Sequence, residues 1–501
     1  MTQHHRIVIV GTGFSDLGIA IRLKQEGEED FVLLERAGDI GGTWRDNTYP
    51  GCRCDVPSHL YSFSFAPNPN WSSTFSPQEE ILDYLKDCAE RFGVLPHICF
   101  DTELESAQWD GDEALWRIET STGSMTANFL VAGQGPLSEP ALPKVPGLED
   151  FEGTAFHSAQ WDHDHDLTGK RVAVVGTGAS AIQFVPEIQP KVGRLHVFQR
   201  TAPWVMPHRN RPLRGWERTL YRLFPPAQLA MRAGIYWARE LFVLLFRHPP
   251  VNKLLEQLPL RHMRSQIEDP DLQRKLTPEY SMGCKRILPA DEWYPALAQP
   301  NVELVTGGVT EIRPHSIVAE DGTEREVDTI IFGTGFHVTD IPIADRVRGA
   351  DGRTLADTWN GSMTAYKGTT VAGYPNLFFV VGPNTGLGHT SIVFMIESQV
   401  EYVLDALRTM RARGAGTLEV REEAQRAYNA ELDRMTEGTV WVTGGCSSYY
   451  IDRNGHNSAL WPTYTWPFRR RLRHFDPAAY ALRTRVSAPG GEREPAAAAH
   501  A

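Results

Sequence analysis

The chain has 501 residues, of which 41% are hydrophobic and 22% charged, and it carries a formal net charge of −12. This length predicts two or three domains, each with a sizeable core. The acidic balance argues against a nucleic-acid-binding protein, because such a protein needs a net basic surface.

Cysteine usage and the N-terminus give the first expectations about location. Six cysteines in 501 residues form neither a disulfide framework nor a zinc ribbon by their spacing, which is typical of a reducing cytosol and predicts a cytoplasmic protein. The N-terminal residues lead directly into an apolar run, without the apolar core of a signal peptide. The longest run of bulky apolar residues, 241–246, is far shorter than the ~20 residues that span a bilayer, so no transmembrane segment is expected.

The first motif is a glycine turn between an apolar strand and a helix. A strand is expected at residues 6–10, and Gly11-Thr-Gly13 follows it directly; a second strand at 31–34 ends in Glu35. This order is typical of a dinucleotide-binding unit, in which the acidic residue binds ribose hydroxyls; a purely structural strand–turn–helix is the alternative. Asp16 stands where the third glycine belongs, and we expect its bulk and negative charge to weaken binding of the diphosphate.

The same pattern returns 165 residues later in the chain. A strand at 171–175 precedes Gly176-Thr-Gly178, and a strand at 195–198 is followed by Arg200 in the register of Glu35. An arginine at this position suits the 2′-phosphate of NADP, whereas an acid suits a free 2′-hydroxyl; a solvated surface arginine is the alternative. The two turns therefore predict two bound dinucleotides, FAD in the first and NADPH in the second.

These features predict an α/β protein with two Rossmann-like dinucleotide-binding domains and a mostly helical insert. Prolines and Gly147 mark the crossing from the first domain to the second, and an apolar run at 328–332 with a glycine turn marks the return. The expected divisions are 1–147 for the first part of the FAD-binding domain, 148–325 for the NADP-binding domain with the insert at about 208–280, 326–486 for the second part of the FAD-binding domain, and 487–501 for a disordered tail.

A specific string lies between the two glycine turns. Residues 151–162, Phe-Glu-Gly-Thr-Ala-Phe-His-Ser-Ala-Gln-Trp-Asp, match the pattern FxGxxxHxxxW(P/D). With both turns around it, the chain resembles the type I Baeyer–Villiger monooxygenases from about residue 6 to 475, and most closely their hydroxyacetophenone-monooxygenase-like branch. The segments 41–55, 283–286 and 382–386 resemble further parts of that family's pattern.

The resemblance implies an enzyme that uses FAD, NADPH and O₂ to insert one oxygen atom beside a ketone carbonyl, through a C4a-peroxyflavin, giving an ester or lactone. It implies that Arg286 is the catalytic arginine with Asp55 as its carboxylate neighbour, and that Lys285, Arg200 and Thr201 hold the 2′-phosphate. A fixed cation suits this chemistry, because arginine stays protonated and offsets the charge of a peroxide anion. The cofactor-binding residues expected in all are Gly11, Gly13, Ser15, Glu35, Thr43, Trp44, Asp46, Asp55, Tyr61, Leu104, Gly176, Thr177, Gly178, Ser180, Gln183, Arg200, Thr201, Lys285 and Arg286.

For several residues a purely structural role is an alternative to a functional one. His157 of the string is at least as consistent with a structural histidine in a domain linker as with an acid or base. His163-Asp-His165-Asp has no third group of ligands at useful spacing, so no metal site is expected. The family resemblance implies a tryptophan against the nicotinamide where this chain has Tyr449, and this departure predicts weaker coenzyme retention.

Three other functions compete with ketone oxidation. A flavin monooxygenase of sulfides or amines would use the same cofactors. A disulfide reductase is disfavoured, because Cys52 and Cys54 are too close for a usual redox pair. A non-catalytic NADP(H)-binding protein with impaired FAD binding would follow if Asp16 excluded the flavin.

The sequence leaves the particular ketone and the oligomeric state open, the latter as monomer or homodimer. The aromatic-rich insert is compatible with a bulky or aryl ketone, with a helical cover packed on the core, and with a surface for a membrane or a partner subunit. The aromatic residues concerned are Trp216, Tyr221, Phe224, Tyr236, Trp237, Phe242 and Phe246.

Overall fold

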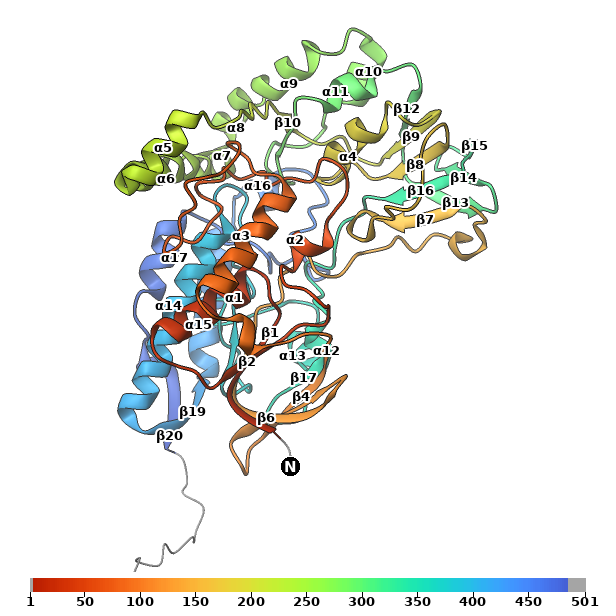
Figure 1. Ribbon diagram of the computed structural model, residues 1–501. Helices are drawn as coiled ribbons and strands as arrows, with labels where there is room; N and C mark the ends of the chain where they lie inside the picture. The colour runs from red at the N-terminus through yellow and green to blue at the C-terminus, as the bar shows by residue number, and fades with distance from the viewer. Residues whose placement is uncertain (1–2, 485–501) are drawn as a thin grey trace, which may run out of the picture.

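The structure, a computed structural model, describes residues 3–484 and shows two α/β units, the second of which carries an inserted helical segment (Figure 1). The expected tail at 487–501 lies outside the described residues. The first sheet has the strand order β17-β4-β5-β6-β1-β2-β3, with β18 also paired to β6. Its strands are β1 (Gln3–Val10), β2 (Phe31–Leu34), β3 (Ile98–Cys99), β4 (Leu104–Asp110), β5 (Leu115–Thr120), β6 (Gly123–Ala132), β17 (Val347–Arg348) and β18 (Leu377–Phe379).

Successive side chains of β1 point to opposite faces of the first sheet, and a separate hydrophobic core lies on each face. Ile7 and Ile9 pack with the helices of one face, whereas Val8 and Val10 join a second cluster on the other face with residues of β4 and β5. Strand β1 pairs in parallel with both β2 and β6, so the first glycine turn follows the carboxyl end of a central strand. The helices of the first face are α1 (Phe14–Gln25), α3 (Gln78–Arg91) and α14 (Ile392–Arg413).

The second sheet is entirely parallel, in the order β12-β9-β8-β16-β7. Its strands are β7 (Thr154–His157), β8 (Arg171–Val175), β9 (Arg194–Gln199), β12 (Val302–Thr306) and β16 (Thr329–Phe332). Helices α4 (Ala181–Ile188) and α11 (Trp293–Leu297) pack together beside it, and β13 (Val309–Arg313), β14 (Ser316–Ala319) and β15 (Glu324–Glu326) form an antiparallel layer.

The boundary expected at residue 325 was wrong. Strand β16 pairs on one side with β8 and on the other with β7, so it completes the second sheet and the chain returns to the first domain only after Phe332. An isolated apolar strand fits either sheet by its own sequence, and long-range pairing decides which sheet it joins.

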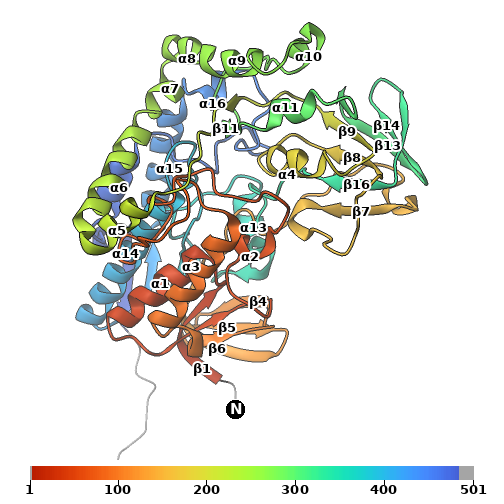
Figure 2. The ribbon, with the colours of Figure 1, turned by 45° about the horizontal axis from the view of Figure 1, so that its top comes forward.

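The segment between β9 and β12 carries a row of helices along one rim of the molecule (Figure 2). They are α5 (Gly215–Leu223), α6 (Pro225–Glu240), α7 (Val243–Arg247), α8 (Pro249–Leu255), α9 (Gln257–Arg264) and α10 (Pro270–Lys275), flanked by the short paired strands β10 (Val205–Met206) and β11 (Leu288–Pro289). Within the described residues, no helix is both long enough and apolar enough to cross a membrane.

The C-terminal part closes over the first domain and reaches the helical segment. Its helices are α12 (Ile343–Arg346), α13 (Leu355–Trp359), α15 (Glu422–Thr436), α16 (Val440–Thr443) and α17 (Thr465–Leu472), and the distant strands β19 (Ala415–Val420) and β20 (Tyr480–Thr484) form an antiparallel pair. The short helix α2 (Thr43–Asp46) belongs to the first domain. A disulfide joins Cys284 to Cys446, 162 residues apart. The spacing of the six cysteines predicted no disulfide framework and gave no signal for this pair.

Candidate functional site

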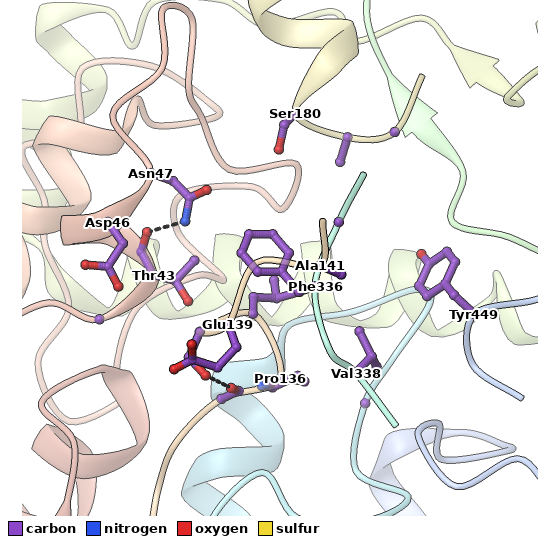
Figure 3. Close-up of a pocket in the computed structure, with 18 of the residues that line it drawn as sticks. Thr43, Asp46, Asn47, Pro136, Glu139, Ala141, Ser180, Phe336, Val338 and Tyr449 are labelled. Carbon is purple, nitrogen blue, oxygen red and sulfur yellow. Dashed lines mark hydrogen bonds between the residues drawn. The ribbon is translucent and has the colours of Figure 1, made fainter. Parts of the chain in front are cut away.

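One large cavity of about 990 Å³ lies between the two domains, and both glycine turns line it. Figure 3 shows its wall built from distant parts of the chain, with Thr43 and Asn47 of the first domain, Ser180 of the second and Tyr449 of the C-terminal part. All the residues expected to bind cofactors lie along this cavity. Its size and its two glycine turns fit elongated dinucleotides.

The first turn is built for close approach to its own helix. Gly11 has φ +117°, and a Cβ there would lie 2.6 Å from the carboxyl of Asp16. Asp16 is buried and accepts a hydrogen bond of 3.0 Å from the Gly13 N–H. Its carboxyl occupies the space that a Cβ at position 133 would need, so it fits only because residue 133 is a glycine. Gly133 therefore makes the room that the third glycine normally makes.

The charge expected on Asp16 is not supported by its surroundings. Burial raises the pKa of this carboxyl well above its ordinary value, the hydrogen bond from Gly13 opposes the shift, and the charge of Glu35 adds to it. The raised pKa favours the neutral carboxyl, which does not repel a diphosphate. The electrostatic reason for expecting weak FAD binding is thus reduced.

The ribose end of the first unit is held rigidly. Glu35 is 4% exposed and accepts hydrogen bonds from Thr12 Oγ1 at 2.5 Å and from the Ala37 N–H at 2.9 Å. Arg45 forms an ion pair with it at 2.7 Å. Sequence reasoning missed Arg45, although it lies inside the segment 41–55 that carried the resemblance.

The rest of the first-domain wall comes from the loop after β2 and from β4. Trp44 Nε1 donates to the Tyr61 hydroxyl at 3.1 Å, and Asn47 closes α2 with a bond of 2.9 Å to the Thr43 carbonyl (Figure 3). Burial raises the pKa of Tyr61, so this phenol stays neutral. The other predicted residues of this wall, Ser15, Asp46 and Leu104, also lie along the cavity.

The second glycine turn resembles the first in its geometry. Gly176 has φ +110°, and a Cβ there would lie 2.5 Å from the carbonyl oxygen of Gly333 at the end of β16. Thr177 Oγ1 donates to the Thr201 carbonyl at 3.3 Å, which ties the turn to the end of β9. Ser180 immediately precedes α4, where free N–H groups favour a phosphate.

Gln183 was predicted to bind a cofactor, and the structure shows that it also connects the two domains. Its Oε1 accepts hydrogen bonds from the Tyr49 hydroxyl at 3.0 Å and from the Arg53 N–H at 3.2 Å, and its Nε2 donates to the Arg53 carbonyl at 3.1 Å. A Cβ at Gly51 would lie 2.9 Å from the Gln183 carbonyl oxygen, so the two domains meet closely here.

Two cations face each other beside the second turn. Arg200 and Lys285 both line the cavity, although they come from opposite ends of the helical segment. Burial and then the charge of Arg200 lower the pKa of Lys285. An anion between them would relieve this repulsion, and a 2′-phosphate supplies such an anion.

A bidentate ion pair lies deeper in the cavity. Arg286 Nε and Nη2 donate to the two Asp55 carboxylate oxygens at 2.5 and 2.6 Å. Burial opposes the charged form of each side chain, but the partner's charge and hydrogen bonds outweigh it, so the pKa of Arg286 is raised well above its ordinary value and that of Asp55 is lowered. The structure thus brings together the two residues expected to be catalytic.

The structure also adds neighbours of Arg286 and Asp55, of which sequence reasoning had named only Tyr449. Arg239 Nη2 donates to the Asp55 carbonyl at 3.3 Å from helix α6. Tyr449 donates to the Tyr450 hydroxyl at 2.8 Å, and both line the cavity near Arg286. The Cys284–Cys446 disulfide joins the loop of Arg286 to the loop of the two tyrosines. Only long-range folding brings these segments together.

The fingerprint histidine has a structural environment. His157 is 1% exposed, its Nδ1 accepts from the Ala159 N–H at 3.1 Å, and its ring meets Phe336 edge-on at 5.6 Å. Burial lowers its pKa. Gly153 permits close packing, since a Cβ there would lie 2.5 Å from the Asp328 carbonyl oxygen. The segment 151–162 therefore has a structural role where the chain crosses between the two domains.

Two competing chemistries find no support at this site. Cys52 and Cys54 are buried free thiols; burial raises the pKa of Cys52 to about 12 and also raises that of Cys54, so neither is a reactive thiolate. Within residues 3–484, no group of three or more His, Cys, Asp or Glu side chains is placed to hold a metal ion.

Comparison with known proteins shows the family of the chain. Residues 4–347 match the family model described as flavin-binding monooxygenase-like. The chain is 54% identical over 483 residues to a protein of Streptomyces coelicolor named Baeyer-Villiger monooxygenase, covering 96% of this chain and 93% of the relative. A protein of the same name from Pseudomonas aeruginosa is 51% identical over 485 residues, covering 96% and 92%.

Solved structures show the same architecture. Cyclohexanone monooxygenase from Rhodococcus sp. Phi1 bound to NADP⁺ has a TM-score of 0.87 at 28% identity, covering 97% of this chain and 100% of that one. A steroid monooxygenase bound to NADP has a TM-score of 0.85 at 30% identity, covering 96% and 100%. The predicted fold class and the family resemblance are confirmed. The chain, with its two glycine turns opening on one cavity, belongs to the flavin-binding monooxygenase-like family.

Proposed function

We propose that the protein is an FAD- and NADPH-dependent monooxygenase that inserts one oxygen atom from O₂ beside a ketone carbonyl, giving an ester or lactone. The observation that carries this proposal is the Arg286–Asp55 pair, which lies in the cavity shared by the two glycine turns. The names of the relatives from Streptomyces coelicolor and Pseudomonas aeruginosa support the same reaction.

The cavity fits both cofactors by the residues that line it. The turn at Gly11 and Gly13, the carboxylate of Glu35 and the loop with Thr43 and Trp44 would hold FAD. When bound, reduced FAD activates O₂ for transfer to the ketone, with NADPH as the source of electrons. The turn at Gly176 and Gly178 with its flanking residues would hold NADPH, and these residues are Thr177, Ser180, Arg200, Thr201 and Lys285.

Arg286 supplies a fixed positive charge that cannot be lost by deprotonation. Asp55 holds the guanidinium in one orientation through two hydrogen bonds. In an enclosed site such a charge stabilises the negative charge that develops on oxygen during its transfer. Because its pKa is raised further by Asp55, Arg286 does not act as a proton donor. The pair therefore serves electrostatics and orientation.

The test is a panel of aryl, cyclic and linear ketones, with a sulfide included, scored for oxygenated product beside NADPH consumption and hydrogen peroxide. We expect ester or lactone from at least one ketone class. In Arg286→Ala, NADPH consumption should persist while ester formation falls by about a hundredfold or more and peroxide rises, as for loss of one key electrostatic group.

An Arg286→Ala enzyme that makes ester at the rate of the unchanged enzyme would remove this residue from the mechanism. Sulfoxide as the only product of the panel would replace the ketone proposal by heteroatom oxidation. The cytoplasmic location and the choice between monomer and homodimer stay proposals from the sequence, and the Cys284–Cys446 disulfide weakens the argument for a reducing cytosol.

A further inference from the structure

Helix α6 has an inverted distribution of polar and apolar side chains. Its polar residues Gln228, Arg232, Arg239 and Glu240 are buried or half-buried and bond to groups of the protein interior. No charged side chain of α6 is exposed. Its exposed residues are all apolar or glycine, and they are Pro225, Pro226, Leu229, Ala230, Met231, Ala233, Gly234, Trp237 and Ala238. A surface helix of an ordinary globular domain shows the opposite arrangement.

This apolar surface continues along the helices from α5 to α9, residues 215–264, which we call the insert face. It carries thirteen of the nineteen large hydrophobic side chains that are exposed among the described residues. Leu223 of α5, Trp237 of α6 and Leu254 of α8 are 77%, 57% and 73% exposed. Figure 2 places these helices along one rim, away from both sheets. Apolar patches of this extent mark interaction sites.

The charge of the insert face is opposite to that of the whole chain. Residues 215–264 contain eight Arg and Lys against three Glu, in a protein of net charge −12. The three acids are withdrawn from solvent: Glu217 and Glu240 are buried, and the half-buried Glu256 accepts the Met282 N–H at 3.0 Å. Basic side chains are exposed beside the apolar ones, and these are Arg222, Lys253, Arg261 and Arg264.

We propose that the insert face binds the surface of an anionic phospholipid bilayer, with α6 lying in the interfacial plane. Exposed Trp, Phe and Leu side chains enter the acyl boundary, while arginine and lysine meet anionic headgroups. A second copy of the chain fits less well, because symmetric pairing would place two faces of the same positive charge together. On its inner side α6 reaches Asp55 through Arg239, so the docking face and the cavity lie on opposite sides of one helix.

The test is co-sedimentation of the full-length chain with vesicles of phosphatidylcholine alone or mixed with phosphatidylglycerol. We expect binding only to the mixed vesicles, and weaker binding in higher salt. Trp237→Ser with Leu241→Ser should weaken it by about tenfold or more, because two exposed apolar groups are lost. Lys253→Gln with Arg261→Gln should weaken it by about fivefold per charge.

Leu95→Ser is the matched control, since Leu95 is an exposed leucine of the first domain outside the insert face. It should bind vesicles like the unchanged chain, and all variants should keep their melting temperature. Binding to neither vesicle type, or equal binding to both, would overturn the proposal. A second outcome would also overturn it: light scattering shows a dimer, the double variant Trp237→Ser with Leu241→Ser dissociates this dimer, and the chain binds no vesicles.

Discussion

Asp16 is a buried acid whose protonation state couples stability to pH. Its pKa is raised in the folded chain, chiefly by burial, whereas the unfolded chain has the ordinary value of 3.8. As pH rises above that value the unfolded state loses the proton first, so the free energy of unfolding falls until the folded carboxyl also ionises. Asp16 therefore lowers the free energy of unfolding at neutral pH and does not lower it in acid.

Asp16→Asn should therefore stabilise the protein at neutral pH, by about 1–3 kcal/mol, because the amide keeps the acceptor for Gly13 and carries no charge. The gain should shrink as pH is lowered toward 4. Melting temperature against pH for both proteins, with flavin content measured beside it, checks this expectation. A stability difference that stays constant from acid to neutral pH would show that Asp16 does not titrate as described.

Arg200 and Lys285 should determine the choice of coenzyme. A charge-assisted bond to a 2′-phosphate contributes about 1.5–3 kcal/mol, so kcat/KM should favour NADPH over NADH by about tenfold or more. In Arg200→Ala most of this preference should disappear through a higher KM for NADPH, with the KM for NADH unchanged. Steady-state kinetics with both coenzymes measure this. Equal use of the two coenzymes by the unchanged enzyme would refute the role of Arg200.

At the scale of elements, local patterns predicted well what depends on local geometry. Gly11 and Gly176 follow central parallel strands and adopt positive φ, as strand–turn–helix units require. The sheet that β16 joins, the space that Gly133 leaves for Asp16 and the pairing of Cys284 with Cys446 depend on contacts between distant segments. Their sequence signals are ordinary, so no pattern in one chain predicts them.

The disulfide joins two loops that meet over the cavity. Cys284 immediately precedes Lys285 and Arg286, its carbonyl accepts a hydrogen bond of 2.9 Å from Ser448 Oγ, and Tyr449 follows Ser448. Cys446→Ser removes the covalent link and should lower the free energy of unfolding by about 2–4 kcal/mol. Because the loop that carries Arg286 is then less restrained, the amount of oxygenated product formed per NADPH consumed should fall. The amount of hydrogen peroxide released should rise.

Cys99→Ser provides the comparison for this loss, since Cys99 is a free, exposed cysteine far along the chain from both loops. It should change neither the melting temperature nor the ratio of product to NADPH. If Cys446→Ser lowers the melting temperature but leaves that ratio intact, the disulfide stabilises the fold without positioning Arg286.

For the whole molecule, Gln183 governs how the two domains are held across the cavity. Its three hydrogen bonds to Tyr49 and Arg53 cross the boundary, whereas Gln189, at the end of the same helix, bonds to Asn301 within the second domain at 2.6 Å. Each such bond contributes about 1 kcal/mol. Gln183→Ala should therefore loosen the placement of one domain on the other while both domains stay folded.

We expect Gln183→Ala to slow flavin reduction by NADPH by about tenfold or more, because a displacement of about 1 Å between reacting groups can cost a hundredfold in rate. Flavin content should be unchanged, since the first turn and Glu35 are untouched. Anaerobic rapid mixing with NADPH measures the reduction rate directly. Gln189→Ala should lower the melting temperature to a similar extent and leave that rate intact. Equal slowing in both variants would mean that α4 acts through the stability of its own domain, and the bridge from Gln183 would then have no part in aligning the two halves of the cavity.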